Sequence, residues 1–571
     1  MCGIVGFIDR SNTTQKEQIV KNMMDTIVHR GPNSAGQFID EGAALGFRRL
    51  SIIDLEGGTQ PIKNEDGTKI ITFNGEIYNY QSIREDLIAK GHIFTTNADT
   101  EVLLHGYEEY GIDLLQKIRG MFAFVIWDTK KQELFGARDH FGIKPLYYTM
   151  MNGTFMYGSE IKSFLQHPNF VKELNKEALK PYMTFQYSAL DETFFKNVYR
   201  IKEGHYFTYK DGQLDIQQYW DVKEQETNMT LEETVDLIDD TVVKSVEAHR
   251  IADVEVGSFL SSGVDSSYVT AVLRPEHSYS IGFGDKSYNE SIEAKKLADL
   301  IDLNNTSRVV TGDEAFEYFP LIQYHLDEPD SNPSCVPLYF LTELASRDVR
   351  VALSGEGADE LFAGYQAYGM NTKSKVVKVV AEGLKKLPKN MRYSIAKGLK
   401  GKTFKGALHL YTSLAPAEEF FIGQAKVFEE DEAVDYLQPE YKQSPSIKEI
   451  VDVHYEKVQD MSEIKKMQYL DMHQWMPKDI LLKADKLAMA NSLEVRVPLL
   501  DKEMMKVSEI VPTKYLINAE NTKFAFRQAA ARHLPEEWYN REKLGFPVPI
   551  KDWLREEKFY QLVRDVFTQD F

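Results

Sequence analysis

From residue 254 onward, short apolar runs of β-forming residues alternate with segments of helical period. The β-forming runs are VEVGSFL (254–260), SYSIGF (278–283) and VRVALSG (349–355). Strands that alternate with helices in this way predict a parallel sheet with helices on both faces. Beyond residue 366 the period is almost wholly helical. We therefore expect a parallel α/β sheet followed by a largely helical region.

The first part of the chain follows a different pattern. Residues 14–28 have a helical period, and β-rich runs such as KIITF (69–73) and GMFAFVIWD (120–128) follow, separated by turn residues. This pattern predicts sheets with a few packing helices. The 571 residues, 43% of them hydrophobic, are enough for two cores. Because the composition turns polar around residues 210–232, we expect domains at 2–212 and 213–571.

Charge and cysteine content exclude several classes of protein. The net charge of -20 argues against nucleic acid or an anionic membrane as the principal partner, because either requires a basic surface. Cys2 and Cys335 are the only cysteines, so no disulfide framework is expected. We expect a cytoplasmic protein, since no N-terminal signal pattern and no run of about 18 apolar residues is present. The 13 histidines form neither HExxH nor a cluster with paired CxxC, which argues against zinc.

Cys2 follows the initiator methionine, so one cleavage would leave a cysteine with a thiol and a free α-amine. The amine, with a pKa of about 8, could serve as the general base for the thiol. A buried cysteine in an edge strand is the alternative interpretation. Donors, charged groups and tight backbone for attack on a carboxamide are available in RGPNS (30–34), RRLSIID (48–54), FNGEIYN (73–79) and ADTEV (98–102). Cys2 is the predicted nucleophile.

A loop of serines and glycine, FLSSGVDSS (259–267), follows an apolar strand and enters a helical period. Backbone N–H groups and the positive end of the helix dipole can hold phosphate there, and the hydroxyls add donors. A turn that only caps the helix is the alternative. A second loop, LSGEGADELFAGY (353–365), carries the acids Glu356 and Asp359. Both loops should meet at the carboxyl edge of the sheet, where phosphate donors beside carboxylates suit a triphosphate with magnesium.

Two lysines farther along are predicted phosphate contacts. Lys486 lies beside Lys483 and Asp485, and such charges are usually a solvated face. Their surroundings are strongly apolar, so we expect Lys486 to reach a phosphoryl oxygen. Lys543 precedes a Gly-Pro loop and is either a pyrophosphate contact or a surface residue. The sequence ends within a helical period without a capping signal, which leaves the completeness of the C-terminus open.

Together, MCGIVGF, RGPNS, RRLSIID, FNGEIYN, SSGVDS, SGEGADELFAGY and KADKLAMANSLEVRVPLLD resemble the motifs of glutamine-dependent asparagine synthetases. They occur in the family's order and span nearly the whole chain. MCGIVGF with FNGEIYN resembles class II glutamine amidotransferases, and SSGVDS resembles the loop of ATP pyrophosphatase-type synthetases. The resemblance implies an N-terminal αββα sandwich of the Ntn-hydrolase type. It also implies a C-terminal parallel α/β domain with a PP-loop.

The resemblance implies roles for residues of the first domain. Asn74 and Gly75 would form the oxyanion hole beside the Cys2 nucleophile. An arginine matches a carboxylate bidentately, so Arg49 would bind the glutamine α-carboxylate. Glu76 and Asp99 would meet the α-ammonium. The residues implied to bind glutamine are Arg49, Leu50, Ser51, Ile52, Ile53, Asn74, Gly75, Glu76 and Asp99.

In the second domain the resemblance implies an ATP site with magnesium. Asp265 and Asp359 would hold Mg²⁺ or face the pyrophosphate. Glu356 would help to form and resolve an acyl-adenylate, with Lys486 and Tyr365 near the reacting groups. The residues implied to bind ATP are Leu260, Ser261, Gly263, Asp265, Ser266, Ile281, Ser354, Gly355 and Tyr365.

Two features depart from the family's pattern. Ser262 stands where the family's loop usually has a second glycine, which adds a side chain where the backbone approaches pyrophosphate closely. The segment HLDEPDSNPSCVPLYF (325–340) differs from the threonine- and arginine-containing acceptor segment of the best-known bacterial enzymes. The aspartate-binding residues therefore cannot be carried over.

The implied reaction makes L-asparagine from L-aspartate through β-aspartyl-AMP, with ammonia from L-glutamine. Glutamine, aspartate and ATP are the expected partners, and a homodimer is compatible with them. Ammonia should pass through the interior, and we expect an apolar channel. Alternatives are amidation or lactam closure of another carboxylate, a glutaminase or phosphosugar amidotransferase, and a catalytically silent regulatory protein. The glutaminase reading leaves SSGVDS and GEGADELFAGY unexplained.

Overall fold

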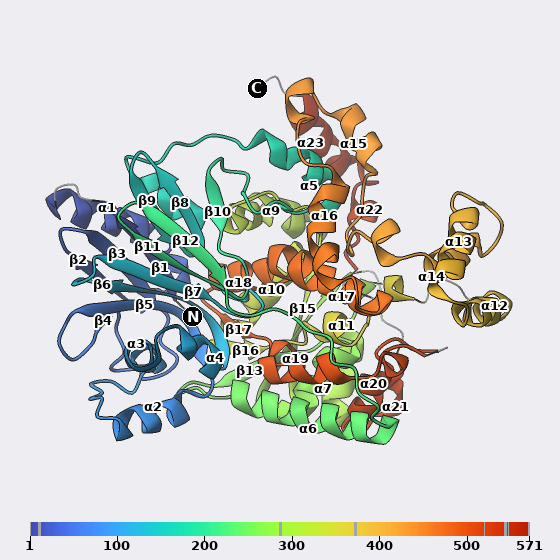
Figure 1. Ribbon diagram of the computed structural model, residues 1–571, viewed down its shortest axis with the longest axis horizontal. Coiled ribbons are helices and arrows are strands. Elements are labelled where there is room, and N and C mark those ends of the chain that lie inside the picture. Colours follow the sequence, from blue (N-terminus) through green and yellow to red (C-terminus); the bar gives the residue numbers. More distant parts are fainter. Residues whose placement is uncertain are drawn as a thin grey trace.

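The computed structural model describes residues 2–9, 13–284, 288–369, 374–518, 520–541, 545 and 547–568 (Figure 1). Lys543, a predicted pyrophosphate contact, lies outside this set. Two antiparallel sheets form the first domain. In spatial order, the first sheet contains β10 (Val198–Arg200), β8 (Tyr147–Met151), β9 (Thr154–Gly158), β1 (Gly3–Ile8), β3 (Ala43–Arg49) and β2 (Ser34–Ile39). The second contains β12 (Gln213–Gln218), β11 (His205–Lys210), β7 (Glu133–Arg138), β6 (Gly120–Asp128), β5 (Lys69–Ile77) and β4 (Ile62–Lys63).

The two sheets pack face to face, and helices cover their outer faces. In β1, Ile4 packs between the sheets and Val5 packs toward α1 (Thr13–Asp25), as expected from the two-residue period of a strand. In β6, Val125 faces the other sheet and Phe124 faces the helical side. The helices on that side are α2 (Tyr80–Ala89) and α3 (Asp99–Tyr110). The result is four layers, helix, sheet, sheet and helix.

β12 pairs with β11 along its whole length, from Gln213 to Gln218. The predicted boundary at 212/213 assigns these residues to the second domain, whereas their pairing joins them to the first. An extended segment then leads to α6 (Leu231–His249), which opens with a capping box between Thr230 and Glu233.

The second domain contains the predicted parallel sheet. Its strands, in spatial order, are β15 (Asn304–Val310), β14 (His277–Phe283), β13 (Val256–Phe259), β16 (Val351–Leu353) and β17 (Glu494–Arg496). Helices lie on both faces, with α6, α7 (Val264–Leu273) and α19 (Lys502–Ile510) on one side and α10 (Cys335–Ala345) and α18 (Leu481–Ala490) on the other (Figure 1). The predicted runs correspond to β13, β14 and β16, whereas β15 was not among the predicted runs and β17 belongs to a segment predicted to be helical.

The remaining part is mainly helical, as predicted. Its longer helices are α8 (Ser291–Leu300), α9 (Gly312–Leu326), α12 (Lys375–Lys385), α13 (Lys389–Leu399), α14 (Ala407–Leu414), α16 (Ile447–Tyr455), α17 (Glu463–His473) and α23 (Glu557–Thr568). Shorter helices include α11 (Ala358–Leu361), α15 (Glu430–Tyr436), α20 (Phe524–Ala530), α21 (Glu536–Tyr539) and α22 (Ile550–Trp553), and the first part of the chain contains the short helix α5 (Leu179–Phe185). Within the described ranges, no helix combines the length and apolarity needed to cross a bilayer.

Candidate active sites

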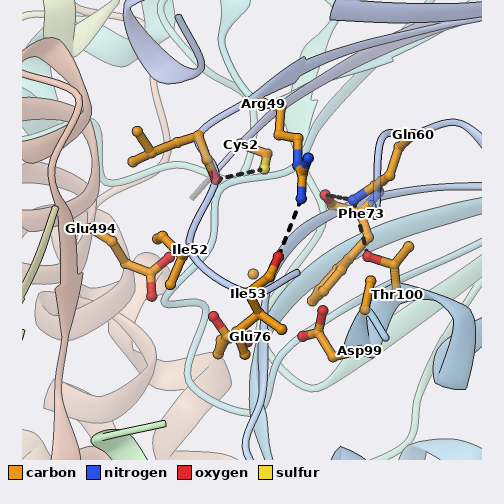
Figure 2. A pocket seen from close by; sticks show the side chains of 14 residues that line it. Cys2, Arg49, Ile52, Ile53, Gln60, Phe73, Glu76, Asp99, Thr100 and Glu494 are labelled. Atoms are coloured by element: carbon orange, nitrogen blue, oxygen red, sulfur yellow. Dashed lines mark hydrogen bonds between the residues drawn. The ribbon is translucent and has the colours of Figure 1, made fainter. Parts of the chain in front are cut away.

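A pocket in the first domain opens beside Cys2, at the start of β1 (Figure 2). The Cys2 Sγ–H points at the carbonyl of Leu50, 3.9 Å away, and Arg30 Nε donates to the Cys2 carbonyl at 3.1 Å. Burial raises the pKa of the Cys2 thiol, so the reactive thiolate requires a base close by. The residues lining the pocket are Cys2, Arg49, Leu50, Ile52, Ile53, Gly58, Gln60, Phe73, Gly75, Glu76, Ala98, Asp99, Thr100 and Glu494.

Asn74 and Gly75 in β5 lie next to this cysteine. The Cys2 backbone nitrogen donates to Asn74 Oδ1 at 3.0 Å. The other end of the same amide, Nδ2, is buried and has no hydrogen-bond partner among the described residues. A Cβ on Gly75 would lie 2.1 Å from the Met121 carbonyl oxygen, so only glycine allows β5 to approach β6 this closely. Asn74 therefore offers one buried donor beside Cys2, as an oxyanion requires.

Arg49 supplies a buried cation to the pocket. Its side chain is held by the backbone, with Nη2 donating to the carbonyls of Ile53 at 3.2 Å and Asp54 at 2.6 Å. The residue is only 5% exposed. These contacts fix the guanidinium without neutralising its charge, which suits it to an anionic group of a ligand.

Glu76 and Asp99 form an acidic pair across the pocket from Arg49 (Figure 2). Burial, reinforced by the Asp99 charge, holds the pKa of Glu76 well above its ordinary value, and burial raises that of Asp99 to about 6. Asp99 Oδ2 accepts from the Ile77 N–H at 2.9 Å. Two buried acids this close cannot both ionise readily, and a bound ammonium would remove that restriction. The pocket thus has a cation, Arg49, on one side and two acids, Glu76 and Asp99, on the other.

The second domain supplies one wall of this pocket. Glu494 in β17 lines it, and the neighbouring Arg496 is fully buried. Arg496 pairs with Glu494 at 2.6 Å and with Glu76 of the first domain at 2.8 Å. The carbonyls of His249 and Ile251 accept from the same guanidinium at 2.7 and 2.6 Å. The pocket is therefore built across the domain interface.

The second site lies where two loops of the parallel sheet meet. One loop connects β13 to α7, and the other connects β16 to α11. A Cβ on Gly355 would lie 2.5 Å from the backbone nitrogen of Ser266, so glycine permits the contact between the loops. Ser261 and Ser266 share a hydrogen bond of 2.9 Å between their hydroxyls. The predicted ATP residues in or beside the ends of β13, β14 and β16, three adjacent strands, are Leu260, Ser261, Gly263, Asp265, Ser266, Ile281, Ser354 and Gly355.

Asp265 and Asp359 are brought together, as expected for a metal site, but a lysine lies between them. Lys523 Nζ is 2.7 Å from both oxygens of Asp265 and 2.8 Å from Asp359 Oδ1. No sequence motif indicated Lys523, which is 258 residues from Asp265 along the chain. The two carboxylates remain a suitable donor set for Mg²⁺, because it prefers hard oxygen ligands.

Glu356 lies in the same loop as Asp359, with an oxygen that lacks a partner. Its Oε2 is inaccessible to solvent and has no hydrogen-bond partner within the part of the chain described. Burial, with a smaller contribution from the Asp265 charge, raises the pKa of Glu356 to about 7. A carboxyl group with a pKa near neutrality can exchange protons at physiological pH.

Of the two remaining predicted contacts, Lys486 lies in other surroundings, whereas Tyr365 lies at the end of the second loop. Lys486 Nζ is 2.6 Å from Asp327 and donates to the Leu326 carbonyl at 3.0 Å, so its ammonium is already paired away from the glycine-rich loops. The Tyr365 hydroxyl donates to Glu360 at 2.6 Å. Ser262 is buried and donates to Glu290 at 3.0 Å, so a neighbouring carboxylate accommodates its extra side chain.

The interface between the two sites is charged where it meets Cys2. Arg30 is fully buried and pairs with Glu160 at 3.0 Å and with Asp485 of α18 at 2.8 Å. Lys144 lies 3.5 Å from Asp485. This part of the interface does not have the apolar lining that we expected for an ammonia channel, because these ionic groups occupy it.

Comparison with known proteins identifies both halves of the chain. The family model for the glutamine amidotransferase domain matches residues 1–220, and the model for asparagine synthase matches residues 237–570. The chain belongs to the asparagine synthase family. It is 42% identical to asparagine synthetase (glutamine-hydrolyzing) 1 of Bacillus subtilis, over 100% of this chain and 90% of that protein. It is 34% identical to a putative asparagine synthetase (glutamine-hydrolyzing) of Mycobacterium tuberculosis, over 97% of this chain and 88% of that protein.

Similarity to solved structures is weaker. Glutamine phosphoribosylpyrophosphate amidotransferase from B. subtilis aligns with 54% of this chain and 65% of its own, at 15% identity and a TM-score of 0.30. That score is too low to support a fold assignment. Membership of the asparagine synthase family therefore rests on the sequence comparisons.

Sequence reasoning missed several pocket residues of this family member. Gln60 is one, with Nε2 donating to the Phe73 carbonyl at 3.2 Å and to Thr100 Oγ1 at 3.1 Å (Figure 2). Glu494 is another, although it lies within a recognised motif. Phe73 and Thr100 lie close to the predicted site residues Gly75 and Asp99 in the sequence, and this position could have indicated that they line the pocket. Nothing in the sequence relates Gln60 to Cys2.

Proposed function

We propose that this chain makes L-asparagine from L-aspartate and ATP, using nitrogen from L-glutamine and releasing AMP, pyrophosphate and L-glutamate. One observation carries the proposal. The second domain, which holds the two glycine-rich loops, also supplies Glu494 to the wall of the Cys2 pocket. A glutaminase acting alone would not require this shared construction.

In the glutaminase half, removal of Met1 would free the α-amine of Cys2 to take the thiol proton. The thiolate attacks the glutamine carboxamide, forms a γ-glutamyl thioester and releases ammonia. Asn74 Nδ2 and the Gly75 N–H stabilise the oxyanion. Arg49 binds the α-carboxylate, and Glu76 with Asp99 binds the α-ammonium. The four-layered domain is of the Ntn-hydrolase type in this proposal.

In the synthetase half, the aspartate β-carboxylate attacks the α-phosphate of ATP and expels pyrophosphate, giving β-aspartyl-AMP, because a free carboxylate has no adequate leaving group. Ammonia then attacks the acyl carbon of this intermediate, and AMP leaves. The loop at 260–266 acts as a PP-loop that holds pyrophosphate on backbone N–H groups. Glu356 accepts a proton from the attacking ammonia, a role that its raised pKa suits. The ammonium of Lys523 is available to a phosphoryl oxygen once it leaves its carboxylate partners.

Magnesium fits the two carboxylates, Asp265 and Asp359, that meet where the two glycine-rich loops come together. Asp265 and Asp359 would hold it, since their oxygens already converge on one cation. The ion would supply charge neutralisation for the triphosphate. We propose that the enzyme acts in the cytoplasm, where ATP, aspartate and glutamine are available. A homodimer is compatible with this proposed function.

The test is aspartate-dependent release of pyrophosphate from ATP, with the product identified by mass. We expect release with aspartate and asparagine as the product, with glutamine or ammonium as nitrogen source. A panel of other carboxylic acids examines the alternative, amidation of a different acceptor. Pyrophosphate release that aspartate does not stimulate would contradict the proposal.

A further inference from the structure

Four side chains of the first domain converge outside the glutaminase pocket. Glu65 comes from the turn between β4 and β5, His92 follows α2, and His105 and Glu108 belong to α3. One potential ligand atom from each lies within 4.8 Å of all the others. Helices α2 and α3 lie together at the edge of the domain, near β4 (Figure 1).

The separations match those between the ligands of one small ion. His105 Nδ1 is 3.2 Å from Glu65 Oε2 and 3.1 Å from Glu108 Oε2. His92 Nδ1 is 3.0 Å from Glu65 Oε1. Tetrahedral zinc with bonds of about 2.0–2.1 Å places its ligand atoms about 3.3 Å apart. An ion could therefore enter with shifts of only a few tenths of an ångström in these three separations.

The surrounding groups orient these side chains as they would around a metal. His105 directs Nε2 at Glu101 Oε1, 3.4 Å away, which leaves Nδ1 for the cluster. Glu101 is itself fixed by the N–H groups and hydroxyls of Thr95 and Thr96, at 2.7 to 3.0 Å. Asn64 Nδ2 donates to Glu108 Oε1 at 2.6 Å, which leaves Oε2 for the cluster. A carboxylate that orients a ligating histidine is typical of zinc sites.

The charge of the cluster also favours a cation. Glu65, Glu101 and Glu108 surround the almost completely buried His105 ring. The Lys69 ammonium lies 3.6 Å from Glu108 Oε1 and 3.9 Å from Asp128 Oδ2, so its charge is divided between two carboxylates. A divalent ion would neutralise this excess of carboxylates.

We propose that Glu65, His92, His105 and Glu108 bind a divalent transition-metal ion, with Zn²⁺ the best match to two imidazoles and two carboxylates. The sequence argued against zinc because its 13 histidines form neither HExxH nor a cluster with paired CxxC. The four ligands of this site come instead from three separate segments. The ion would join the β4–β5 turn to α3. Helix α3 begins at Asp99 and continues with Thr100, and both residues line the Cys2 pocket. By fixing α3, the ion would therefore hold one wall of that pocket in place.

The test uses the full chain carrying Cys2→Ala, so that the thiol cannot bind metal. After treatment with a chelator and dialysis, Zn²⁺ stoichiometry is measured by elemental analysis and affinity by competition with a chromophoric chelator. We expect one ion per chain and a rise in Tm on loading. Co²⁺ should give the visible absorption of a tetrahedral site.

Variants locate the site. His92→Ala and Glu65→Gln, both near the surface, should each weaken Zn²⁺ binding at least tenfold, and Glu101→Gln should weaken it about 10- to 100-fold. His277→Ala is the matched control, since that partly exposed histidine lies 3.6 Å from Glu255 in the other domain. Absence of stoichiometric Zn²⁺, or equal affinity in the His92→Ala and control proteins, would overturn the proposal. Circular dichroism checks that each variant is folded.

Discussion

At the scale of single residues, each candidate site contains a buried polar atom without a hydrogen-bond partner among the described residues. Asn74 Nδ2 and Glu356 Oε2 both lack a hydrogen bond within the described residues, although burying an unpaired polar atom is costly. Each lies in a loop or strand that the sequence motifs had identified. A partner supplied by the substrate accounts for both.

Asn74→Ala should lower kcat for glutamine hydrolysis about 100- to 1000-fold, because one donor to the oxyanion is lost. Glutamate release measures the effect. Asparagine formation from ammonium chloride should be unchanged, since the second site keeps all its residues. Asn22→Ala, in α1, is the control. Unchanged glutamate release in Asn74→Ala would exclude this residue from the oxyanion hole.

Glu356 should make stability depend on pH. Its folded-state pKa of about 7 exceeds the ordinary 4.5, so its contribution to stability is complete below pH 4.5 and is lost as pH rises through 7. Glu356→Gln cannot ionise and should gain about 2–3 kcal/mol over the wild-type protein between pH 5 and pH 8. Thermal unfolding at both pH values measures this difference. An equal difference at pH 5 and pH 8 would contradict the pKa shift.

At the scale of elements, the close contact between the loops after β13 and β16 builds the second site. Gly355→Ala places a Cβ against the backbone of Ser266 and should separate the loops. Aspartate-dependent pyrophosphate release should fall about 100-fold, because small displacements of catalytic groups are costly. Glutaminase activity should be retained.

Gly383→Ala is the matched control for this substitution. Gly383 is inside α12, with open space around its Cβ position, so alanine should be neutral or stabilise the helix by up to about 1 kcal/mol. A Gly355→Ala protein that is as active as this control would show that the loop contact is unimportant.

Sequence periodicity predicted these elements well where neighbours along the chain also pair in space. The alternation from residue 254 gave the parallel sheet, and the strand-end motifs gave both loops. β17 was missed because its three residues continue a segment of helical period and pair with β16, some 140 residues earlier. β15 was missed because its residues are mostly polar and exposed and form no apolar run. Lys523 was missed for a similar reason, since only tertiary folding brings it between Asp265 and Asp359.

At the scale of the whole molecule, buried ion pairs join the two domains around Cys2. Arg30→Met would leave Glu160 and Asp485 without this cation and should destabilise the fold by about 3–5 kcal/mol. Denaturant unfolding measures this loss. Arg48→Met is the control, because its pair with the half-exposed Asp25 should contribute no more than about 1 kcal/mol. Similar losses in both variants would contradict a structural role for the interface charges.

Cooperation between the two sites is tested most directly with Cys2→Ala. Asparagine formation is measured with ATP and aspartate, supplied either with glutamine or with ammonium chloride. The account predicts that glutamine-fed synthesis disappears while ammonium-fed synthesis remains near the wild-type rate. Glutamine-fed asparagine formation that survives in Cys2→Ala would contradict it.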